Sequence, residues 1–142
     1  MVDFLLYGMM RVKDLCITNS VQLRTYINMR MWMVDPKIMC RKHLLGEHVE
    51  IHMFNGHIRR GRQIYGYVKS NCVEVLSMNK RHDEIASEMI RRHYKHNSPL
   101  NKISSEDLSY LGSPTINAKV DSKESLKDLI TRCSECRERA GI

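Results

Sequence analysis

One segment constrains the fold of this chain more than any other, because its composition predicts a single long helix with a defined start. Asp35-Pro36 pairs a side chain that caps helix N-termini with the residue best suited to the first helical position, where no backbone N–H is needed. Helix-forming residues continue to Phe54, and Asn55-Gly56 is a pair suited to a left-handed C-terminal cap. The sequence therefore predicts a helix of about five turns over residues 36–54.

The apolar residues of this predicted helix are distributed over more than one face. At about 100° per residue, Leu45 and Val49 lie in one arc, and Leu44 and Ile51 lie in another. A helix of this kind is expected to be surrounded by other elements. The remaining arc, about 80° wide, contains Cys40, His43, Glu47, Glu50 and Phe54. It brings one imidazole and two carboxylates together, which is a pattern that acid–base chemistry can use.

The remainder of the chain predicts further helices and no extended sheet. Asn79 can cap a helix from Lys80 to about Tyr94, and Asp121 with Glu124 predicts a final helix that ends near Arg139. In the first of these helices we expect Ile85, Met89 and Ile90 to face inward and Lys80, Arg81, Arg91 and Arg92 to face outward. Residues 57–77 predict a basic loop followed by short extended or irregular pieces, and residues 104–111 one or two turns. The expected fold is all-α, a single compact domain of about three main helices with irregular connections.

Length and charge narrow the class of protein. The 142 residues are 42% hydrophobic, which is enough for one modest core. The net charge is +7, and residues 29–97 carry +6 of it, so any site for a polyanion is expected in that core segment. Residues 1–28 form an N-terminal extension, and residues 98–142 a neutral helical segment with a structural or dimerising role. The apolar runs are too short for a membrane span and the first residues lack a signal peptide, so a cytoplasmic protein is expected.

The cysteines and histidines do not predict a metal site. The chain has five cysteines, and in the cytoplasm we expect free thiols. Cys133 and Cys136 form one CxxC pair, but Cys40 is isolated in sequence from any second pair. His48 and His52 stand four residues apart without an obvious third ligand, so they are interpreted as surface or core histidines. No metal and no cofactor are expected.

Two stretches of the sequence resemble the pyrimidine dimer DNA glycosylases. They are RMWMVDP at residues 30–36 and HLLGEHVE at residues 43–50, and the resemblance continues to about residue 97. It implies a compact all-α enzyme that excises ultraviolet-induced pyrimidine dimers from double-stranded DNA and then nicks the strand. In this family a free N-terminal α-amine attacks C1′ of the damaged nucleotide, and the resulting Schiff base decays by β-elimination. An α-amine suits this role because its pKa is about 7.7–8.0, against about 10.4 for lysine.

The resemblance also assigns roles to individual residues. Glu50 matches the central catalytic carboxylate, Glu47 the first acid of the motif, and His43 the histidine close to the reaction centre. Met29 matches the position of the nucleophilic amine, and Arg30 matches an arginine that grips phosphate. The other basic residues expected to contact DNA are Arg59, Arg60, Arg62, Lys80, Arg81, Arg91 and Arg92.

Two departures from the family pattern leave alternatives open. Val49 and Met53 occupy positions where the family has basic side chains, so the lesion that is recognised could differ. In addition, 28 residues precede Met29, and in that chain its nitrogen is an unreactive amide. The active form could begin at Met29, a lysine such as Lys37 or Lys42 could replace the amine, or the protein could be a non-catalytic DNA binder that keeps the fold. A glycosylase for another altered base is a further alternative. We expect a monomer acting at the nucleoid of a bacterial or phage-infected cell.

Overall fold

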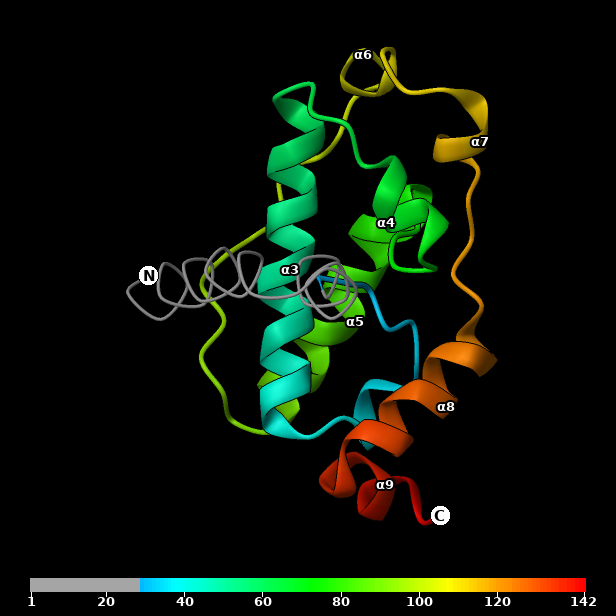
Figure 1. Ribbon diagram of the computed structural model, residues 1–142. Coiled ribbons are helices and arrows are strands. Elements are labelled where there is room, and N and C mark those ends of the chain that lie inside the picture. The colour runs from blue at the N-terminus through cyan, green and yellow to red at the C-terminus, as the bar shows by residue number, and fades with distance from the viewer. Residues whose placement is uncertain (1–28) are drawn as a thin grey trace, which may run out of the picture.

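The computed structural model describes residues 29–142, and they form helices joined by irregular segments (Figure 1). The N-terminal extension, residues 1–28, lies outside the described residues. The elements are η1 (Pro36–Ile38), α3 (Arg41–Arg59), α4 (Tyr65–Lys69), η2 (Val75–Ser77), α5 (Met78–Arg91), α6 (Ser105–Leu108), α7 (Ser113–Ile116), α8 (Ser122–Arg132) and α9 (Ser134–Ala140). Residues 29–142 contain no strand, so the all-α prediction is confirmed. In the same range, no helix combines the length and apolar character needed to cross a bilayer.

The long helix begins later and ends later than its sequence signals predict. Asp35 does cap a helical start, since its side chain accepts from Lys37 N–H at 3.0 Å, but this start belongs to the short 3₁₀ helix η1. The helix α3 itself runs from Arg41 to Arg59, so the predicted end at Asn55-Gly56 is wrong. The physical reason is tertiary: the Asn55 side chain donates to the Asn101 carbonyl at 2.7 Å, and the next turn adds a buried isoleucine to the core.

A segment without regular secondary structure, residues 29–34 and called the N-terminal segment below, runs through the core and is held by three other parts of the chain. Met31 N–H donates to the carbonyl of Cys72 at 2.6 Å. The hydroxyl of Ser125 in α8 donates to the carbonyl of Trp32 at 2.5 Å. The guanidinium of Arg81 in α5 donates to the carbonyl of Val34 at 2.7 Å. The backbone around Arg30 is therefore held in position by hydrogen bonds with Cys72, α5 and α8.

Helix α5 runs antiparallel to α3 and packs against it (Figure 1). Ile85 and Met89 are buried in this contact, as predicted. Ile90 is 60% exposed, so its predicted inward position is wrong; Met89 already occupies the inward position, and Ile90 lies about 100° further round the helix. Between α3 and α5, residues 65–69 form the short helix α4 where the sequence predicted an extended or irregular piece.

The C-terminal segment folds back on the start of α3 (Figure 1). Asp121 caps α8 as predicted, since its side chain accepts from the N–H groups of Lys123 and Glu124. The predicted single helix is broken, however, at Cys133. That residue is extended, with φ −126° and ψ 111°, and its sulfur accepts from Cys136 N–H to begin α9. The break turns both cysteines of the CxxC pair toward the N-terminus of α3.

Candidate functional site

Glu50 lies in the middle of α3 and faces the N-terminal segment, residues 29–34. Its side chain is largely covered, with the residue 8% exposed, and Oε2 accepts from the backbone N–H of Arg30 at 3.1 Å. Met29, the residue before Arg30, is anchored in the hydrophobic core by its side chain. The structure therefore brings together the three residues Met29, Arg30 and Glu50, which the sequence placed in one reaction centre.

Glu47, one turn earlier on α3, is fully buried and paired with a residue of α5. Both carboxylate oxygens accept from Arg81, at 2.5 Å from Nε and 3.0 Å from Nη2. Burial disfavours the charge on Arg81, yet the hydrogen bonds and the charge of Glu47 raise the pKa of Arg81 above its ordinary value. The prediction that Arg81 faces outward to DNA is wrong, because Glu47 and the Val34 carbonyl hold its guanidinium inside the protein.

The side chain of Arg30 reaches α8. Its guanidinium stacks 3.9 Å from the centre of the Trp32 ring, and its two terminal nitrogens donate to Asp128 at 2.7 Å and Ser125 at 3.2 Å. The third nitrogen, Nε, is buried and has no hydrogen-bond partner among the described residues. An unsatisfied buried donor of this kind costs about 1–3 kcal/mol.

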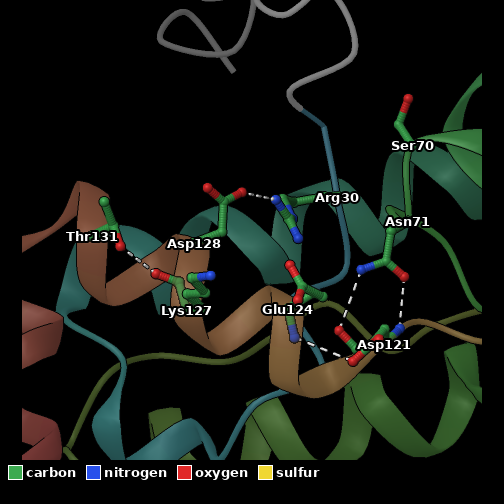
Figure 2. Close-up of a pocket in the computed structure, with 8 residues that line it drawn as sticks. All are labelled: Arg30, Ser70, Asn71, Asp121, Glu124, Lys127, Asp128 and Thr131. Carbon is green, nitrogen blue, oxygen red and sulfur yellow. Dashed lines mark hydrogen bonds and ion pairs between the residues drawn. The ribbon is translucent and has the colours of Figure 1, made fainter.

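An open pocket of about 620 Å³ lies beside Arg30 (Figure 2). Its lining residues are Arg30, Ser70, Asn71, Asp121, Glu124, Lys127, Asp128 and Thr131. Figure 2 shows Arg30 and Asp128 facing each other across an ion pair, while Asn71 and Asp121 are joined by two hydrogen bonds. Carboxylates outnumber cations in this lining, so the pocket as a whole is not suited to a phosphate group.

The exposed arginines expected to contact DNA lie at two separate places. Arg59, Arg60 and Arg62 are exposed at the C-terminal end of α3. Arg91 is exposed at the C-terminal end of α5, which lies near the opposite end of α3 because the two helices are antiparallel (Figure 1). With 19 residues, α3 is about 28 Å long, so Arg91 does not form one compact patch with the three arginines after α3.

Arg92 and Lys80 complete the predicted set of basic DNA contacts. Lys80 is exposed in the first turn of α5, as expected. Arg92 is largely buried, since its guanidinium donates to the carbonyls of Pro36 and Lys37 and to the carboxylate of Glu88. The predicted outward position of Arg92 is therefore wrong, because these acceptors around η1 hold it against the protein.

His43 belongs to a cluster of cysteines rather than to the immediate surroundings of Glu50. Its Nδ1 lies 3.2 Å from Cys40 Sγ and 3.7 Å from Cys136 Sγ, and Cys133 Sγ lies 3.8 Å from Cys40 Sγ. Burial, together with the charges of Lys42 and Arg132, lowers the pKa of His43. Cys40 is isolated in the sequence, but in the structure it lies beside Cys133 and Cys136. The sequence signal for this cluster is the CxxH spacing at residues 40–43, but only the fold brings that pair together with the CxxC pair.

A second group of ligand-type side chains joins α3 to α5 and the residues that follow it. The Nε2 atom of His96 lies 3.0 Å from that of His48 and 3.4 Å from that of His82. Burial and the neighbouring imidazoles lower the pKa of His48 to about 4. The fold thus groups His48 with His82 and His96, and not with His52, and these three imidazoles could hold a transition-metal ion.

Comparison with known families now relates this geometry to a class of enzyme. The sequence profile described as pyrimidine dimer DNA glycosylase matches residues 29–102, which is more than half of the chain. The chain belongs to the pyrimidine dimer DNA glycosylase family. Searches of curated proteins and of solved structures gave no significant match.

Membership in this glycosylase family makes the protein a DNA repair enzyme whose substrate is DNA. The matched region contains Met29, Arg30 and Glu50 and also the exposed arginines after α3. It ends before α8 and α9, although these helices supply Asp128 and Ser125 to Arg30 and two cysteines to the cluster around His43. This glycosylase therefore builds part of the surroundings of its site from residues beyond the region that defines the family.

Proposed function

We propose that this glycosylase excises ultraviolet-induced pyrimidine dimers from double-stranded DNA and then cleaves the strand as an abasic-site lyase. The observation that carries the proposal is the hydrogen bond from Arg30 N–H to Glu50 Oε2, at 3.1 Å. It sets a buried carboxylate one residue from Met29, where the family has its nucleophilic amine. A carboxylate at that place can transfer the protons that imine formation and elimination require.

The proposed reaction uses the α-amine of Met29 in a chain that begins there. The neutral amine attacks C1′ of the damaged nucleotide, the glycosidic bond breaks, and its electron pair leaves with the base. Loss of a proton from nitrogen and opening of the sugar ring then give an imine between Met29 and C1′. Glu50 carries protons in these steps, and removal of a proton from C2′ expels the 3′ phosphate by β-elimination. The damaged nucleotide must leave the helical stack first, and a distorted lesion lowers the cost of that step.

Contacts to the DNA backbone are assigned to the exposed arginines after α3. Val49 is exposed on α3 at a position where the family has a basic side chain, so other cations have to hold the duplex at this helix. Arg59, Arg60 and Arg62 supply positive charge at the end of the same helix. Arg30, which matches an arginine that grips phosphate in the family, would have to exchange its contact with Asp128 for one with the DNA.

Borohydride trapping on ultraviolet-damaged duplex DNA tests the proposal. A chain that begins at Met29 is expected to give a covalent adduct, and the 142-residue chain to give little, because its Met29 nitrogen is an amide. Mass spectrometry of the trapped peptide should place the adduct on the α-nitrogen of Met29. Equal trapping by both chains would instead indicate a lysine such as Lys37 or Lys42. Absence of trapping in both, with binding retained, would indicate a non-catalytic DNA-binding protein.

A further inference from the structure

We propose that Cys40, His43, Cys133 and Cys136 bind a structural zinc ion. The four ligand atoms, three sulfurs and one imidazole nitrogen, lie within 4.8 Å of one another. Three thiolates with one histidine are a common ligand set of closed, four-coordinate zinc sites. This inference concerns a site that the glycosylase reaction does not use, and it does not depend on the proposed lesion or nucleophile.

The distances between the ligand atoms agree with tetrahedral coordination. With Zn–S bonds of about 2.3 Å and a Zn–N bond of about 2.0–2.1 Å, a regular tetrahedron separates two sulfurs by about 3.8 Å and sulfur from nitrogen by about 3.6 Å. Cys133 Sγ lies 3.8 Å from Cys40 Sγ. His43 Nδ1 lies 3.7 Å from Cys136 Sγ and 3.2 Å from Cys40 Sγ. An ion at the centre of the cluster would therefore require only small adjustments.

The same distances do not fit a disulfide. A disulfide joins two sulfurs at about 2.05 Å, far less than the 3.8 Å between Cys133 and Cys40. All three cysteines of the cluster are free thiols in the structure.

The backbone around the cluster is arranged to support thiolates. Cys40 N–H donates to Cys136 Sγ at 3.2 Å, and Cys136 N–H donates to Cys133 Sγ at 3.5 Å. Such amide donors orient metal-bound sulfurs and stabilise their negative charge. Cys40 and Cys133 each occupy the residue just before a helix, and His43 and Cys136 lie in the first turns that follow. Two pairs with the same three-residue spacing thus meet at two helix starts.

Zinc at this cluster would connect the two ends of the described chain. Cys40 and His43 precede and begin α3, whereas Cys133 and Cys136 lie at the start of α9, so the ion would close a loop of about ninety residues. The ring of His43 contacts Trp32 edge-on, with ring centres 5.6 Å apart, and Trp32 carries the stacked guanidinium of Arg30. The ion would therefore also stabilise the side of the site that positions Arg30.

Metal analysis of the full chain tests the assignment. Protein purified without chelators should contain about one zinc ion per chain bound through thiolates, and the double variant Cys133→Ser/Cys136→Ser should lose it. The matched control is Cys72→Ser, since Cys72 is also a buried cysteine but lies outside the cluster, and this variant should keep its zinc. Cys136→His preserves a ligand and should retain zinc as well, which separates loss of metal from loss of folding.

Cobalt substitution separates this site from the histidine group of His48, His82 and His96. Co²⁺ bound to three thiolates gives an intense sulfur-to-metal charge-transfer band, which imidazole ligands cannot produce. We expect this band in the wild-type chain and in His82→Gln/His96→Gln, and we expect to lose it in Cys133→Ser/Cys136→Ser. A wild-type chain without metal, a Co²⁺ spectrum without the thiolate band, or a disulfide among these cysteines would overturn the proposal.

Discussion

Arg81 donates hydrogen bonds to both carboxylate oxygens of Glu47, and the side chains of Arg81 and Glu47 are only 2% and 0% exposed. The contact joins α5 to α3, and a further nitrogen of the same guanidinium holds the Val34 carbonyl at 2.7 Å. Val34 ends the N-terminal segment, residues 29–34, which carries Met29 and Arg30 past Glu50. Glu47, the first acid of the motif, is thus bound by Arg81 inside the protein. We infer that Glu47 positions the segment next to Glu50, the second acid, and does not contact the substrate.

Removing the charge of Glu47 should therefore destabilise the fold. Glu47→Gln leaves the buried guanidinium of Arg81 with no buried counter-charge, and breaking a buried pair in this way costs about 3–5 kcal/mol. Urea unfolding at neutral pH measures the difference in the free energy of unfolding. Glu84→Gln is the control, because Glu84 is 41% exposed and meets Arg81 by a single contact of 3.4 Å, so its loss should cost no more than about 1 kcal/mol. Equal effects of the two variants would refute the positioning role.

The helix boundaries show which parts of the fold the sequence could predict. Asp35 and Asp121 each cap a helix by accepting from backbone N–H groups two or three residues further along the chain. These contacts are local, so the sequence predicted both caps correctly. The end of α3 was predicted wrongly because Asn55 binds a backbone carbonyl 46 residues away, and no local rule can weigh that contact. The break at Cys133 was missed for the same reason, since its extended backbone serves contacts with the start of α3.

The candidate site shows a similar division. The resemblance located Glu50, Arg30 and Met29, and the structure brings these residues together. Arg81 looked like a surface residue because an arginine on an amphipathic helix usually faces water, and only the buried carboxylate from another helix reverses that expectation. Likewise, the spacing within each cysteine or histidine pair is visible in the sequence, but the meeting of residues 93 positions apart is a property of the fold.

Substitution of Glu50 tests its role in proton transfer. Glu50→Gln keeps the shape of the side chain and its ability to accept from Arg30 N–H, but it can no longer carry a proton. In a chain that begins at Met29, strand cleavage should fall by about 10²–10⁴, while binding to damaged duplex survives. Single-turnover cleavage and a gel-shift titration measure the two quantities. Glu106→Gln, an exposed change on α6, is the control; cleavage by folded Glu50→Gln at the control rate would remove Glu50 from the mechanism.

The exposed arginines after α3 should control the salt dependence of DNA binding. Replacing Arg59, Arg60 and Arg62 with glutamine is expected to weaken binding to any duplex. It should also flatten the slope of log K against log salt, by up to about one unit for each phosphate that the variant no longer neutralises. Fluorescence anisotropy at several salt concentrations measures this slope.

A control with the same change in net charge distinguishes direct binding from long-range attraction. Lys102, Lys119 and Lys123 are three exposed cations outside residues 29–97, and their replacement by glutamine removes the same charge elsewhere. We expect the slope of this control to stay close to that of the wild type. If both triple variants flatten the slope equally, the arginines act only through net charge and do not touch the DNA backbone.

Glu88 should make the stability of the fold sensitive to acid. Hydrogen bonds from Arg91 and then Arg92, against an opposing effect of burial, lower the pKa of Glu88 from 4.5 to about 2. Between those two values the unfolded chain binds more protons than the folded chain, so the stabilisation is complete above pH 4.5 and is lost as the pH falls toward 2. Because Arg91 is 58% exposed, solvent screens part of the interaction, and Glu88→Gln should cost about 1–2 kcal/mol at neutral pH. Urea unfolding of both proteins at about pH 7, 4.5 and 3 should show this difference shrinking at the lowest pH. A difference that stays constant down to the most acidic condition would mean that Glu88 stabilises the protein by packing and not by its charge.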